Sequence, residues 1–230
     1  MIDNMPHSGT RRAIVRFFMA CLIVNILGGA EARWGLNQPL MLMLVFGATN
    51  LFVQLYLLHS AFDATSDSHL RVRSGTIATA ARALRVWCTI VTFFALFMLV
   101  AVFFWQNALG AQVIVLGLST GINVLLLFWY LRAVAQSIGL AQLKTRTNWG
   151  IAGVLVTYAC ILADQFIDYP WGMSPRETEA PNLLVAAIGF SGFCVAVGTI
   201  GAWYRALSPA TWLQMEPASK ASMEQKKGPH

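Results

Sequence analysis

One long apolar stretch, residues 111 to 133 (AQVIVLGLSTGINVLLLFWYLRA), constrains this chain more than any other feature. About 20 apolar residues span the ~30 Å hydrocarbon core of a bilayer, and the first charge in this stretch is Arg132. Trp129 and Tyr130 are residues typical of the membrane interface, where Arg132 can extend to the lipid headgroups. The stretch therefore predicts a transmembrane helix.

Composition extends this prediction to most of the chain. Only 11% of the 230 residues are charged and 57% are hydrophobic, whereas soluble domains have roughly 25% charged residues. The apolar ranges that predict membrane spans are residues 13–30, 39–62, 86–105, 111–133, 149–167 and 183–207. The expected fold is all-α: a polytopic membrane protein of six transmembrane helices in three antiparallel hairpins, with no soluble domain in residues 1–207. Residues 208–230 are polar and are predicted to form a disordered cytoplasmic tail.

The first apolar range has an alternative interpretation as a cleaved signal peptide. Arginines precede it, and the small residues Gly28, Gly29 and Ala30 end it, which is typical of signal sequences. Five further apolar ranges follow, and a count of six pairs evenly into hairpins. We therefore expect the first helix to be retained.

The distribution of basic residues predicts the orientation of these spans. If both termini and the links 63–85 and 133–149 face the cytoplasm, that side holds all 16 Lys and Arg residues except Arg33 and Arg176. Short cytoplasmic links are enriched in Lys and Arg in this way. The sequence thus predicts a bacterial inner-membrane protein with both termini inside. The net charge of +6 is explained by topology, and no nucleic-acid partner is expected.

Small residues at helical spacing predict close helix packing. Gly117 and Gly121 lie one turn apart in the fourth apolar range, and Ser191 and Gly198 belong to a similar series in the last range. Such residues let two membrane helices approach closely. We expect these faces to pack against helices of this chain or of a partner. Besides the lipid bilayer, the expected partner is a second copy or another membrane protein.

Five polar residues are candidates for transport or binding. Asn50, Gln54 and Asn123 are uncharged residues at the predicted membrane depth, where such side chains join helices, contributing about 1 kcal/mol each, or bind a substrate. Asp164 and Asp168 are the ionisable residues within or at the rim of a span, and their spacing puts them on one helix face. Acidic groups inside a membrane are costly and commonly mark functional sites. The alternative is that this helix ends early and both carboxylates lie among the outer headgroups.

Catalytic and cofactor signals are weak. Residues 189–192 (GFSG) resemble the G-x-S-G around the nucleophile of rhomboid-type intramembrane proteases, but the only histidine after Ser191 is His230 in the tail. A serine nucleophile needs a base within hydrogen-bond reach. No nucleotide-binding motif, paired intramembrane histidines or metal-ligand spacing is present, so no cofactor or metal is expected. The four cysteines are isolated in apolar ranges and are expected to be buried.

These observations leave three functional hypotheses. The first is a non-enzymatic scaffold, sensor or accessory subunit that packs against partner helices. The second is a small transporter or channel that uses an outer-leaflet acidic site at Asp164 and Asp168. The weakest is a membrane-embedded enzyme.

Overall fold

The protein folds into long α-helices. The computed structural model describes residues 8–34, 40–66, 75–101, 108–167 and 175–208, and within these ranges it has no β-strand. The helices are α1 (Ser8–Trp34), α2 (Leu40–Ala64), α4 (Gly75–Ala101), α5 (Ala108–Ile138), α6 (Ala141–Ile167) and α7 (Pro175–Ala206). Each predicted apolar range overlaps one of them, so the all-α prediction is confirmed for the described residues.

Four of these helices, α2, α4, α5 and α7, are long and apolar enough to cross a membrane, judged by length and composition. The described parts of α1 and α6 are not long and apolar enough by the same criteria. Helix α1 carries Arg11, Arg12 and Arg16 near its start, and α6 begins with a mostly polar stretch. The four apolar helices are consistent with a helical membrane protein.

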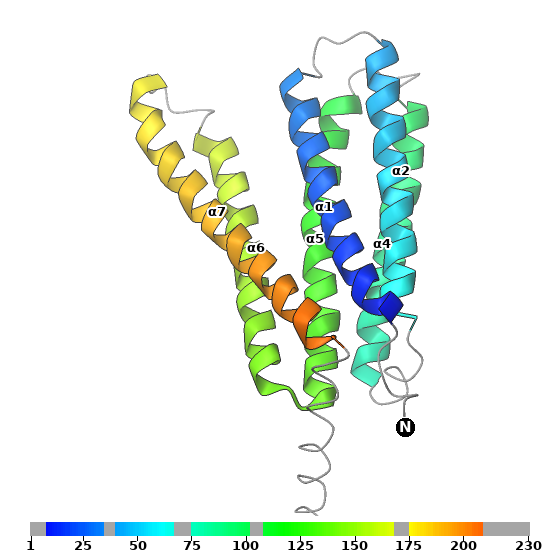
Figure 1. Cartoon of the computed structure of the whole chain (residues 1–230). Coiled ribbons are helices and arrows are strands. Elements are labelled where there is room, and N and C mark those ends of the chain that lie inside the picture. Colours follow the sequence, from blue (N-terminus) through cyan, green and yellow to red (C-terminus); the bar gives the residue numbers. More distant parts are fainter. Residues whose placement is uncertain (1–7, 35–39, 67–74, 102–107, 168–174, 209–230) are drawn as a thin grey trace, which may run out of the picture.

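The helices form a group of four with a pair beside it. Helix α1 lies against α2 and α5, and α4 lies against the same two helices. Helix α6 packs on α5, and α7 is held mainly by α6 (Figure 1). Successive helices alternate in direction, so the start of α1 and the end of α7 lie at the same end of the molecule (Figure 1).

The link between α5 and α6 is much shorter than expected. Only Gly139 and Leu140 separate the two helices, because both extend beyond the apolar ranges. Gly139 has a φ of 78°, a conformation that glycine adopts without steric cost. The Leu140 N–H donates to the Ala135 carbonyl (3.0 Å) and the Gly139 N–H to that of Gln136 (3.4 Å). This pattern of a Schellman motif ends α5 and reverses the chain.

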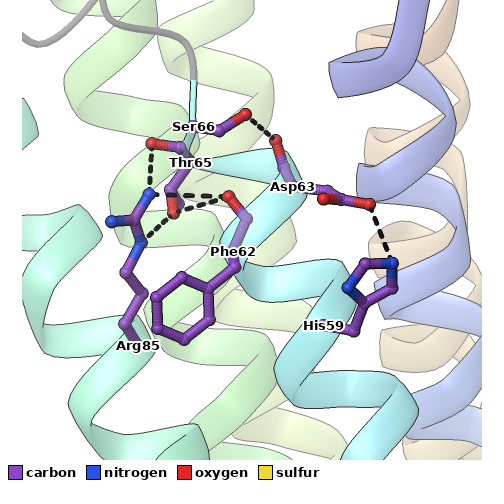
Figure 2. A network of polar contacts seen from close by, with 6 residues as sticks. All are labelled: His59, Phe62, Asp63, Thr65, Ser66 and Arg85. Atoms are coloured by element: carbon purple, nitrogen blue, oxygen red, sulfur yellow. Dashed lines mark hydrogen bonds and ion pairs between the residues drawn. The ribbon is translucent and has the colours of Figure 1, made fainter.

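Side chains from two other helices complete the C-terminal end of α2. Arg85 of α4 donates from Nε to Thr65 Oγ1 (2.6 Å) and from Nη2 to the Thr65 carbonyl (2.7 Å). Its guanidinium also lies 4.8 Å from the centre of the Phe62 ring (Figure 2). The hydroxyl of Tyr130, on α5, donates to the Ala64 carbonyl (3.2 Å). The C-terminal end of a helix has carbonyls without intrahelical partners and carries partial negative charge. Arg85 and Tyr130 donate to these carbonyls and thereby link α2 to α4 and α5.

Candidate functional site

Polar side chains gather halfway along α2, α4 and α5. Asn50 and Gln54 of α2 and Asn123 of α5 are 5%, 1% and 0% exposed. Two residues of α4 lie among them. The Cys88 thiol donates to Asn123 Oδ1 (3.4 Å), and Thr92 Oγ1 donates to the Gln54 backbone carbonyl (3.3 Å). We refer to these five residues as the polar layer.

Three amide atoms of the polar layer are left without hydrogen bonds. Asn50 Oδ1, Gln54 Nε2 and Asn123 Nδ2 are buried and have no partner among the described residues. Burying such a group unpaired costs about 2–7 kcal/mol, and buried polar groups are normally paired with protein, water or a ligand. The layer offers both donors and an acceptor and contains no charged side chain. Each of the three atoms has the capacity for one further hydrogen bond, to water or to an uncharged polar group.

A second polar contact joins α6 to the group of four. The Tyr158 hydroxyl donates to Asn25 Oδ1 on α1 (3.2 Å). The Tyr158 ring lies against Gly121 of α5, where an added Cβ atom would be 2.7 Å from the ring Cζ. The space beside Gly121 is therefore occupied by the Tyr158 ring. The sequence had predicted that the backbone of a second helix approaches closely at this position. Gly117 lies within α5, and its surroundings fall outside the described side chains.

Backbone-to-backbone packing occurs instead between α6 and α7. A Cβ atom added at either Gly153 or Gly192 would lie 2.5 Å from the carbonyl oxygen of the other. One turn along, Thr157 Oγ1 donates to the Gly189 carbonyl (3.0 Å), and at the other end Thr199 Oγ1 donates to the Arg146 carbonyl (3.2 Å). These contacts make α6 and α7 a closely packed pair.

The small residues that were predicted on α7 lie on a different face. Ser191 and Gly198 are exposed, and no atom lies within 4 Å of a Cβ added at Gly198. The Ser191 hydroxyl donates to the Ile188 carbonyl of its own helix (2.7 Å). Cys194 is exposed too, although it was expected to be buried. Glycine permits a closer approach than serine or cysteine, so the Gly189–Gly192 face packs on α6. Ser191 and Gly198 therefore do not pack against another helix of this chain within the described residues.

The two acidic candidates lie outside the described side chains. Asp164 lies within α6 but its side chain is outside the described part, and Asp168 lies outside the described residues. Among the described residues, no group of three His, Cys, Asp or Glu side chains is arranged to hold a metal ion.

Comparison of the chain with protein-family models, with curated proteins and with solved structures gives no match. Its class therefore rests on the all-helical architecture and on four helices that are long and apolar enough to cross a membrane. Any functional assignment has to come from the side chains described above.

Proposed function

We propose that the chain is a six-span integral protein of the bacterial inner membrane, arranged as three hairpins with both termini and residues 208–230 in the cytoplasm. Two observations support this topology: successive helices alternate in direction (Figure 1), and Lys and Arg are concentrated in the termini and two of the links. In this arrangement the exposed Arg12 and Arg16 lie in the first turns of α1, where they reach the headgroups, whereas the guanidinium of Arg11 lies over the Tyr204 ring of α7 (3.5 Å to its centre).

Its function in this proposal is that of a non-enzymatic scaffold, sensor or accessory subunit that holds a partner helix against α7. The observation that carries it is the exposed small-residue face of Ala187, Ser191, Cys194 and Gly198, with open space beside Gly198. Membrane helices associate through such faces. Because α6 holds most of the opposite face of α7, the partner is another membrane protein or a second copy of this chain.

Gly198→Leu in the full-length protein tests this function. The leucine fills the proposed docking face, and no atom lies within 4 Å of its Cβ position, so assembly should be lost while the unfolding temperature of the isolated protein stays unchanged. The measurement is purification in mild detergent, mass spectrometry of co-purifying proteins and the mass of the complex. Ala152→Leu, at an exposed position on α6, is the matched control. Identical assembly in both variants and the wild type would exclude this face as an interface.

A small transporter or channel is the second candidate, because the polar layer contains three unpaired amide atoms. In this hypothesis Asp164 and Asp168, whose side chains lie outside the described part of the structure, form the outer acidic site that the sequence predicts. The test is uptake of glycerol, a small uncharged probe, by liposomes that contain the full-length protein. Asn123→Leu should reduce uptake to the level of empty liposomes, and Asp164→Asn should reduce it more than Asp168→Asn. Thr79→Val, at an exposed position, is the control. No uptake above that of empty liposomes would rule this candidate out.

A further inference from the structure

An open groove of about 390 Å³ runs between α1 and α2. Its walls are apolar, with Met19 and Ile23 from α1 and Phe52 and Val53 from α2. Phe52 is 72% exposed, and Met19 and Ile23 are about half exposed, so these side chains face the surroundings of the bundle. In a membrane, the surroundings of such a groove are acyl chains.

One end of this groove is cationic. Arg16 of α1 and Tyr56 of α2 line it there, at the end where α1 begins and α2 finishes (Figure 1). Arg12, one turn before Arg16, is exposed as well, and neither arginine has an ion pair among the described residues. The Asp63 carboxylate, at the C-terminal end of α2, lies 3.4 Å from His59 Nε2 on the same helix (Figure 2). Among the described residues, this end of the groove therefore presents the exposed guanidinium groups of Arg12 and Arg16.

We propose that this groove binds one acyl chain of an anionic phospholipid whose phosphate contacts Arg16. Basic sites between helices at the cytoplasmic surface bind anionic headgroups, and the apolar walls suit the chain attached to such a headgroup. A partner helix fits less well, because it would bury the guanidinium of Arg16, which has no ion pair among the described residues. The inference rests on the proposed membrane topology, and it is independent of what binds α7.

Native mass spectrometry of the full-length protein in mild detergent tests the proposal. The probes are phosphatidylglycerol and phosphatidylcholine with identical acyl chains at equal concentration. The wild type should retain phosphatidylglycerol preferentially, and Arg16→Gln should lower that preference about fivefold, the contribution of one arginine near the surface. Arg146→Gln, an exposed arginine of α6 that does not line the groove, should leave the preference unchanged.

A second pair of variants tests the apolar walls. Phe52→Ala should weaken retention of both lipids without changing their ratio. Phe93→Ala, at a 68% exposed position on α4, should have no effect. Equal retention of the two lipids by the wild type, or equal effects of Arg16→Gln and Arg146→Gln, would overturn the proposal. So would a co-purifying protein that is released by Phe52→Ala, since the groove would then hold a partner helix.

Discussion

At the scale of single residues, the contact between Gly121 and Tyr158 determines how α6 meets the group of four. Gly121→Ala would place a methyl group 2.7 Å from the ring Cζ, so the ring must move and the hydrogen bond to Asn25 is strained. Overpacking of this kind costs about 1–3 kcal/mol. We expect a lower unfolding temperature in mild detergent, whereas Gly198→Ala, which meets no atom, should have no such effect.

A double variant distinguishes this contact from a general effect of the substitution. Tyr158→Leu removes the ring that the new methyl group would meet. The stability losses of Gly121→Ala and Tyr158→Leu should therefore sum to more than the loss measured in the double variant. Additive losses would contradict the assignment of this contact.

Arg85 provides a second prediction at this scale. Arg85→Lys keeps the positive charge, but an ammonium group cannot reproduce the forked contact with Thr65, so about 1–3 kcal/mol of stability should be lost. Hydrogen exchange should rise at the C-terminal end of α2. Arg82→Lys, at an exposed position on the same helix, is the control, and an equal change in both variants would argue against the cap.

The members of the polar layer show what the sequence reveals about a site. Asn50, Gln54 and Asn123 could be identified because amides are conspicuous in apolar ranges. Cys88 and Thr92 could not, because cysteine and threonine are common in apolar helices and each successive residue is rotated by about 100° around the axis. Which of them faces an amide depends on helix rotation, and that is determined by the packing of the whole bundle.

At the scale of helices, the α6–α7 pair depends on Gly153 and Gly192. Gly153→Ala would place a methyl group 2.5 Å from the Gly192 carbonyl oxygen. Backbone cannot rotate away as a side chain can, so the two helices must separate. We expect a larger fall in the unfolding temperature than for Gly121→Ala. Gly201→Ala, also on α7, is the control, because no atom lies within 4 Å of a Cβ added there. An equal effect of the two alanine substitutions would contradict the close contact.

The helix faces and helix ends were only partly predictable. Small residues recur on two faces of α7, and spacing alone could not show that the Gly189–Gly192 face packs on α6. The C-terminal end of α5 and the start of α6 lie beyond the predicted apolar ranges, because a helix need not end where its apolar residues end. The signal that could have placed this link is Gly139, which interrupts the polar stretch after Arg132.

At the scale of the whole molecule, the proposed topology can be tested with single cysteines in a protein without its native ones. A membrane-impermeant maleimide should label cysteines at Ser66 and Thr145 only from the cytoplasmic side, because the end of α2 and the start of α6 lie at one end of the molecule (Figure 1). A cysteine at Ser174, outside the described residues, should be labelled from the opposite side. Labelling of Ser174 and Ser66 positions from one side would refute the six-span arrangement.

The all-helical class followed from the apolar ranges, because a chain in lipid must satisfy its backbone hydrogen bonds internally. The grouping of the helices did not follow from them. Helix α1 lies against α5 as well as α2, and this arrangement depends on side-chain contacts between segments far apart in the sequence. Hydrophobic ranges carry no information about such neighbours.

The cap on α2 has a consequence for the synthesis of the protein. Arg85 follows Thr65 by 20 residues, and Tyr130 follows Ala64 by 66. At ribosomal rates, Tyr130 is added roughly 3 to 13 seconds after Ala64. During that interval the Ala64 carbonyl lacks the Tyr130 hydroxyl as a donor, and water takes its place. The C-terminal end of α2 therefore lies at an aqueous surface until α4 and the first part of α5 have been synthesised.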